Sequence, residues 1–121
     1  MFSYGNSHGG FLGAILAGRH SEYFTGNVLL NPVLSLPFMI STTDIPDWVM
    51  VEGLNKDDTL DHLTAEDYSR LYELSPLSTP PQVPVCVMIG AKDRRVPHEA
   101  AKVYVSIAKS KGIKTELYMY P

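Results

Sequence analysis

The sequence contains a single cysteine, Cys86, among 121 residues. A lone thiol cannot form a disulfide or a thiolate metal cluster within the chain, so a reducing compartment is expected. No apolar run approaches the roughly 20 residues that a membrane-spanning helix needs, and the start at Met1 lacks the charged and apolar regions of a signal peptide. These absences predict a cytoplasmic protein with no membrane partner.

Basic charge is also scarce. Lys and Arg number 10 against 13 Asp and Glu, the net charge is −3, and the longest basic run is Arg94-Arg95. This balance gives no electrostatic footprint for nucleic acid, which is therefore not expected as a partner. The acidic residues gather between positions 33 and 81, but residues 55–61 lack the spacing of a calcium-binding loop. We predict a solvated loop there, no metal site and no cofactor.

Among the residues that are present, Gly5-Asn6-Ser7-His8-Gly9 forms a G-x-S-x-G pentapeptide. It lies between a short apolar run and a segment whose apolar residues recur at helical spacing. A sharp strand-to-helix turn of this kind lifts a serine hydroxyl out of the surface, where it can act as a nucleophile. Gly5 and Gly9 are expected to leave room for the turn, and Gly10 is a further small position. The pattern predicts Ser7 as a nucleophile, and an ordinary loop serine is the alternative.

Strand-like and helix-like segments alternate along the chain. Apolar or alternating runs predict strands at 1–4, 26–32, 83–90 and 114–120, the third buried on both faces. Periodicity and capping signals predict helices at 11–18, at 64–74 with an apolar face of Tyr68, Leu71 and Tyr72, and from Pro97 to Gly112. The remainder of 33–81 is broken by prolines and is expected to be an irregular excursion. The order predicts an α/β domain with a parallel sheet of about four strands and flanking helices.

Ser7 and Asp93 both follow predicted strands. In parallel sheets chemistry gathers beyond the carboxyl ends of the strands, so the two side chains are expected at one edge. Serine hydrolases of this architecture present their triad in the chain order serine, acid, histidine, and Asp93 follows a later strand, as the acid does. The alternative is a solvated loop carboxylate paired with Lys92 or Arg94.

A base for Ser7 is harder to find among the four histidines. The backbone N–H of His8 suits an oxyanion hole, which leaves its ring directed away from the hydroxyl. His20 lies near a helix end, His62 lies in the excursion, and His98 follows Asp93 too closely to reach Ser7 easily. We expect that the chain stops at Pro121 before the loop that carries the base.

Several segments together resemble the acylaminoacyl-peptidase branch of the prolyl oligopeptidase family. The matching segments are residues 5–12, 31–32, 41–48, 75–76 and 93–97. The pentapeptide is shared by many hydrolases, whereas Thr-Asp-Ile-Pro-Asp-Trp at 43–48 and Asp-Arg-Arg-Val-Pro at 93–97 are much more specific to this branch.

The resemblance implies that residues 1–121 form a single, partial α/β-hydrolase catalytic domain. Ser7 would be the nucleophile, and Asp93 would orient a histidine. Members of this branch release N-acylated amino acids from short peptides and carry an N-terminal β-propeller. The partners thereby implied are a short N-acylated peptide, the remainder of the catalytic domain, the propeller and further copies of the parent enzyme.

Three residues are candidates for contact with the substrate. Trp48 could line an acyl or side-chain pocket, or it could pack against the sheet. Arg94 or Arg95 could bind a substrate carboxylate in a bidentate manner, or could pair with the acidic excursion.

The chain departs from the family pattern because it has no propeller, lacks the early strands and ends before the histidine. The isolated chain is therefore expected to be inactive. Two other classes remain open, a general α/β-hydrolase esterase that uses the same Ser7 and Asp93, and a non-catalytic remnant or interaction module.

Overall fold

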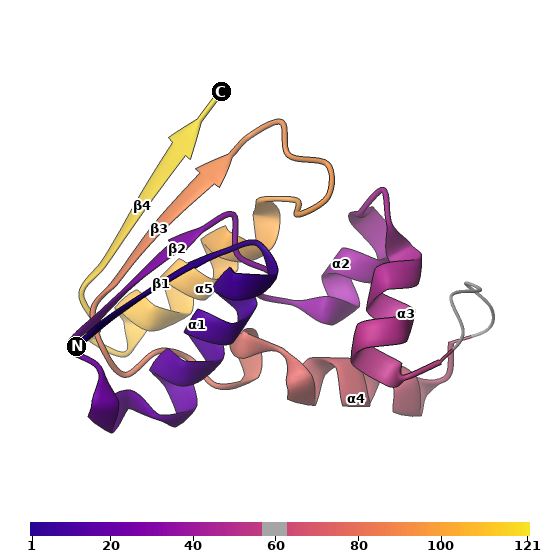
Figure 1. The fold of residues 1–121 in the computed structure, drawn as a ribbon, viewed down its shortest axis with the longest axis horizontal. Coiled ribbons are helices and arrows are strands. Elements are labelled where there is room, and N and C mark those ends of the chain that lie inside the picture. The colour runs from indigo at the N-terminus through magenta and orange to yellow at the C-terminus, as the bar shows by residue number, and fades with distance from the viewer. Residues whose placement is uncertain (57–62) are drawn as a thin grey trace.

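The computed structural model describes residues 1–56 and 63–121. Four parallel strands, β1 (Phe2–Asn6), β2 (Gly26–Leu30), β3 (Val85–Gly90) and β4 (Thr115–Tyr120), form one sheet in the order β1-β2-β3-β4. Because all four strands run in the same direction, their carboxyl ends share one edge (Figure 1). The predicted fold class, a parallel sheet with flanking helices, is confirmed.

Two helices, α1 (His8–Arg19) and α5 (Glu99–Ser110), pack on the same face of the sheet (Figure 1). The core between them and the sheet contains Ala14, Leu29, Val87 and Tyr104, each fully buried. The buried residues recur at every second position of β3, at Val85, Val87 and Ile89, and at helical spacing in α5, at Ala101, Tyr104, Val105 and Ala108, as one-sided burial requires. The prediction that the third strand is buried on both faces is wrong, because β3 alternates buried and half-buried residues.

The opposite face of the sheet carries no helix in the part of the chain that the structure describes. The strand register places Tyr4 beside Val28, Val28 beside Cys86, and Met88 beside Tyr118 on this face. Tyr4 is 69% exposed and Tyr118 45% exposed, whereas Cys86 and Met88 are half-buried. Burial raises the pKa of the Cys86 thiol, with a smaller contribution from Glu116. The bare face is therefore largely apolar.

The segment between β2 and β3 contains more helix than the sequence predicts. It folds into α2 (Leu36–Thr42), α3 (Pro46–Leu54), the predicted α4 (Ala65–Leu74) and the short η2 (Pro76–Ser78); another short helix, η1 (Ser21–Tyr23), follows α1. Pro37 and Pro46 lie in the first turns of α2 and α3. Proline is favourable there because the N–H groups of the first turn have no acceptor within the helix, so the N–H that proline lacks is not needed. These two prolines, which suggested irregularity in the sequence, therefore begin helices.

Helix α4 begins with the predicted capping box. The Thr64 hydroxyl accepts the Asp67 N–H at 3.2 Å, and the Asp67 carboxylate accepts the Thr64 N–H at 3.0 Å. Leu71 is buried in a second apolar cluster with Val49 and Met50 of α3. Tyr68 and Tyr72 are exposed, so the predicted apolar face is wrong at these two positions. The predicted solvated loop at 55–61 lies largely outside the described residues, and His62 lies wholly outside them.

Helix α5 begins later than predicted. His98 is its N-cap residue and Glu99 its first residue, so Pro97 belongs to the preceding loop rather than to the first turn. At the other end Gly112 adopts a φ of 78°, the left-handed conformation typical of the residue that follows a helix, as the sequence predicts. Among the described residues, no helix combines the length and the apolar character needed to cross a membrane.

Candidate active site

Ser7 lies in the turn between β1 and α1 with φ 56° and ψ −115°. Residues other than glycine rarely adopt a positive φ, and such strain persists only where neighbouring contacts enforce it. Here the Ser7 N–H donates to the Leu30 carbonyl at 3.0 Å, and the Ser7 carbonyl accepts the Phe11 N–H at 3.1 Å. The turn is thus fixed to the end of β2 and to the first turn of α1, with Ser7 exposed at the carboxyl edge of the sheet.

The small residues around Ser7 contribute unequally to this turn. A β-carbon on Gly5 would collide with the Gly9 carbonyl, and one on Gly10 would lie 2.8 Å from the Pro32 Cα. A β-carbon on Gly9 would meet nothing within 4 Å. The expectation that Gly9 provides room is therefore wrong, because the turn brings the Gly9 backbone close to Gly5 and brings Gly10, one residue later, against Pro32.

His8 is the first residue of α1, so its backbone N–H has no acceptor inside the helix. Its ring lies against the indole of Trp48 in an edge-on arrangement, with 5.3 Å between ring centroids, and 5.9 Å from the Phe11 ring. The N–H is therefore available beside Ser7, while the imidazole is engaged by aromatic side chains. Trp48, in α3, is half-buried and also packs against the second apolar cluster.

Asp93 lies in the loop of residues 91–98 between β3 and α5, which we call the Asp93 loop. Its Oδ1 accepts the Arg95 N–H at 3.0 Å and the Val96 N–H at 3.1 Å. Within residues 1–56 and 63–121, Oδ2 forms no hydrogen bond. The carboxylate is thus oriented through one oxygen and has the other free as an acceptor.

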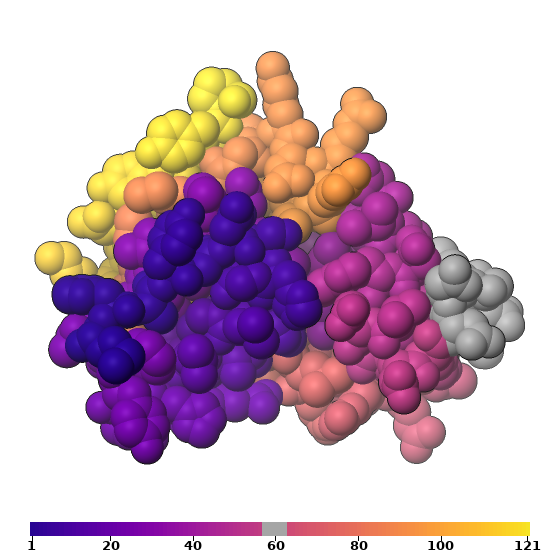
Figure 2. Space-filling model, in the orientation of Figure 1, coloured from indigo at the N-terminus to yellow at the C-terminus, as the bar shows by residue number. Residues whose placement is uncertain are grey.

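The turn between α2 and α3 holds the outer side of the Asp93 loop. The Thr43 hydroxyl donates to the Arg95 carbonyl at 2.6 Å, and the Asp44 N–H donates to the Arg94 carbonyl at 3.2 Å. In the space-filling view, the orange atoms that follow β3 adjoin the magenta atoms of α2 and α3 (Figure 2). The sequence did not suggest a role for Thr43. The Thr43 hydroxyl accepts the Ile45 N–H two residues on, and a threonine in such a turn is a signal that the sequence does contain.

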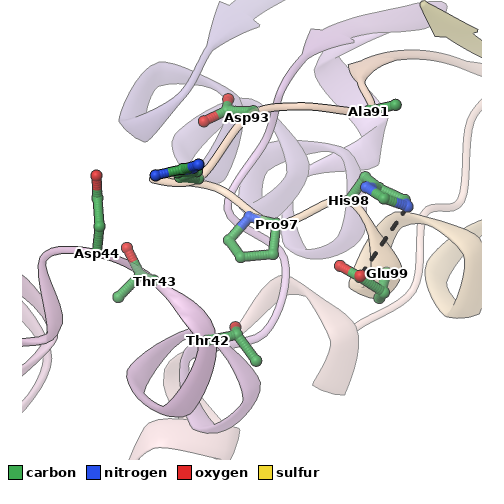
Figure 3. A pocket seen from close by; sticks show the side chains of 9 residues that line it. Thr42, Thr43, Asp44, Ala91, Asp93, Pro97, His98 and Glu99 are labelled. Carbon is green, nitrogen blue, oxygen red and sulfur yellow. Dashed lines mark ion pairs between the residues drawn. The ribbon is translucent and has the colours of Figure 1, made fainter. Parts of the chain in front are cut away.

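A hollow of about 330 Å³ lies where this turn meets the Asp93 loop. Its walls combine the end of α2, the Asp93 loop and the start of α5 (Figure 3). His98 borders it and lies 4.0 Å from Glu99 (Nε2 to Oε1), while the Asp93 carboxylate points away from His98. The structure therefore does not join His98 to Asp93.

The remaining predicted residues are peripheral. Arg94 and Arg95 are exposed, and neither side chain forms an ion pair with any described residue, so the predicted pairing with the acidic excursion is not observed there. His20 caps the carboxyl end of α1 through its N–H, which donates to the Leu16 carbonyl at 2.9 Å. The described residues contain no cluster of three or more side chains suited to bind a metal ion.

The model of the prolyl oligopeptidase family matches residues 1–121 of this chain. The chain belongs to the prolyl oligopeptidase family. The acylamino-acid-releasing enzymes of Sus scrofa and Mus musculus are 38% and 39% identical to this chain in alignments that cover 97% of it. An acylaminoacyl peptidase from Pyrococcus horikoshii superposes with a TM-score of 0.81 at 18% identity, over 99% of this chain and 19% of that one.

Membership in the prolyl oligopeptidase family confirms the resemblance found in the sequence, together with an α/β-hydrolase fold and a peptidase lineage. The chain spans about 16% of the length of the two acylamino-acid-releasing enzymes.

Proposed function

We propose that this chain carries the nucleophile and the acid of a serine hydrolase that releases N-acylated amino acids from short peptides. The observation that carries the proposal is the pair formed by a strained, exposed Ser7 and an Asp93 whose Oδ2 forms no hydrogen bond with the described residues, both following strands at the same sheet edge. The names of the relatives support the acylamino-acid-releasing type.

In the proposed reaction the Ser7 hydroxyl attacks the scissile carbonyl and forms an acyl-enzyme, which water then hydrolyses. The His8 N–H, free at the start of α1, donates to the oxyanion of the tetrahedral intermediate. Asp93 accepts the N–H of an imidazole through Oδ2 and stabilises the imidazolium that forms. We propose that a further part of the parent polypeptide supplies this imidazole, because the ring of His8 is engaged by Trp48 and that of His98 lies near Glu99.

The substrate contacts in this proposal come from α3 and the Asp93 loop. Trp48 lies against His8, so an acyl group or side chain bound there would be close to the oxyanion donor. Arg94 and Arg95 are exposed on the Asp93 loop, where a guanidinium can pair with a peptide carboxylate.

The parent enzyme would combine residues 1–121, as one partial catalytic domain, with the rest of that domain and a β-propeller in a homo-oligomer. A cytoplasmic location is part of the same proposal and rests on the single cysteine.

The test uses the longest polypeptide that the source gene encodes around these residues. An acetyl-alanyl anilide, a blocked prolyl anilide and a short-chain ester are compared at equal concentrations. We expect preference for the acetylated substrate, a loss of about 10⁶ in kcat for Ser7→Ala and of about 10⁴ for Asp93→Asn.

Each contrary result has a separate meaning. Preference for the prolyl substrate would indicate another branch of the family, and preference for the ester would favour the general esterase. Full activity of Asp93→Asn would remove Asp93 from the triad, because asparagine cannot stabilise an imidazolium.

A further inference from the structure

Two consecutive peptide groups of the Asp93 loop are each hydrogen-bonded on both sides. The Arg94–Arg95 peptide donates its N–H to Asp93 Oδ1 and accepts the Asp44 N–H at its carbonyl. The Arg95–Val96 peptide donates its N–H to the same Oδ1 and accepts the Thr43 hydroxyl at its carbonyl. The α2–α3 turn and the Asp93 carboxylate therefore contact opposite sides of the same two peptide groups.

A peptide group is planar, so its N–H and its carbonyl cannot turn independently. A donor that fixes the carbonyl consequently fixes the direction in which the N–H points. A peptide that accepts at one end is also polarised toward stronger donation at the other. Through this coupling the α2–α3 turn controls the two N–H groups that orient the Asp93 carboxylate.

The Thr43 hydroxyl is itself held in place. It accepts the Ile45 N–H at 3.2 Å while it donates to the Arg95 carbonyl at 2.6 Å. The side chain is half-buried, and its hydroxyl is the only side-chain donor among these contacts, since Asp44 acts through its backbone. Thr43 is therefore the member of this arrangement that a side-chain substitution can remove.

We propose that Thr43 is a positioning residue for catalysis, which acts on Asp93 through the Arg95–Val96 peptide. The inference rests on the proposed function, in which Asp93 Oδ2 accepts an imidazole N–H. With Oδ1 held by two N–H groups, the plane of the carboxylate is fixed and Oδ2 keeps one direction. Without the Thr43 hydroxyl, the Arg95–Val96 peptide can rotate, Oδ1 loses a donor and the alignment of Oδ2 relaxes.

The test compares Thr43→Val, which keeps the shape and removes the hydroxyl, with Thr43→Ser, which retains it. The matched control is Thr42→Val, because the Thr42 hydroxyl donates to the Phe38 carbonyl within α2 and not to the Asp93 loop. Assays use the longest polypeptide encoded by the source gene with the acetyl-alanyl anilide. We expect kcat/KM to fall about three- to tenfold in Thr43→Val, as loss of one hydrogen bond implies, and to stay within about twofold in the other two variants.

The pH profile separates positioning from a loss of folded protein. Activity requires a neutral imidazole, so kcat/KM falls below the imidazole pKa, and a well-aligned Asp93 raises that pKa by stabilising the imidazolium. Misalignment in Thr43→Val should therefore move the acidic limb of the profile to lower pH. A smaller amount of folded enzyme would lower the curve without moving the limb. If Thr43→Val does not fold, Thr43→Ala replaces it in the same comparison.

Several results would overturn the proposal. An acidic limb that stays in place in Thr43→Val, or a loss of kcat/KM in Thr43→Ser equal to that in Thr43→Val, would reduce Thr43 to a structural role. The proposed function would still stand in that case if Ser7→Ala and Asp93→Asn were inactive. Retained activity in Ser7→Ala and Asp93→Asn would instead remove both the proposed function and the role of Thr43.

Discussion

Asn31 accepts the Gly90 N–H through its side-chain Oδ1 at 2.7 Å and thereby connects the ends of β2 and β3. Asn31 has a φ of 44°, a left-handed conformation that asparagine tolerates better than most residues. Its own N–H donates to the Met88 carbonyl at 2.8 Å. Asn31 therefore links the end of β2, where the Leu30 carbonyl accepts the Ser7 N–H, to the end of β3, which the Asp93 loop follows.

Substitution of Asn31 should separate the contribution of its side-chain hydrogen bond from that of its left-handed backbone conformation. Asn31→Gly removes the acceptor and keeps an easy left-handed backbone, so we expect a loss of about 1–3 kcal/mol in the free energy of unfolding. Asn31→Ala should lose about 1 kcal/mol more, because its β-carbon disfavours φ 44°. Urea unfolding of the longest polypeptide that the source gene encodes measures the stability loss in each variant. Equal losses in the two variants would show that the backbone conformation carries no cost.

The three glycines near Ser7 should differ sharply in tolerance. Gly5→Ala and Gly10→Ala place a methyl group against backbone atoms of Gly9 and Pro32, so each should lower stability by about 1–3 kcal/mol or more and reduce activity. Gly9→Ala meets open space and removes a flexible residue from the first turn of α1, so stability should be unchanged or rise by up to about 1 kcal/mol. Thermal unfolding and the anilide assay would reveal a different order.

The capping box of α4 predicts a stability loss in acid. The Thr64 N–H, and then Lys56 at 2.9 Å, hold the pKa of the Asp67 carboxyl below its ordinary value. A depressed folded-state pKa contributes stability that is present above the unfolded value, near about 4, and is lost as the pH falls through the folded value. The stability difference between the wild type and Asp67→Asn should therefore shrink below about pH 4. A constant difference from pH 3 to 7 would contradict this assignment.

The bare face of the sheet predicts the behaviour of the isolated 121-residue chain. Tyr4 and Tyr118 are exposed on an apolar face that no described helix covers, and β1 and β4 are open edges. We expect the chain to self-associate and to label with a fluorophosphonate only at background level. Light scattering should show less self-association in a double variant that combines Tyr4→Lys with Tyr118→Lys than in the wild type. A monodisperse wild-type monomer would contradict the first expectation, and labelling abolished by Ser7→Ala would contradict the second.

The sequence predicts the strands, the elbow and the capping box because each depends on neighbouring residues. It misjudges Pro37 and Pro46, since a proline that interrupts a helix and one that begins a helix look alike until the preceding N-cap is known. It also assigns the required space to Gly9 instead of Gly10, because the contact with Pro32 joins residues far apart in the chain. The role proposed for Thr43 depends on a contact with Arg95 that no local pattern contains.

The hydrogen bonds that hold the Asp93 loop have a consequence for the order of folding. Thr43 and Arg95 are separated by 52 positions in the chain, and Asn31 and Gly90 by 59. Contacts of such high sequence separation carry a large loop-closure cost and tend to form late. The elbow of Ser7 requires only the docking of β1 and β2, whereas Asp93 becomes oriented after the helices between β2 and β3 have packed. A newly made chain would therefore present its nucleophile before its acid.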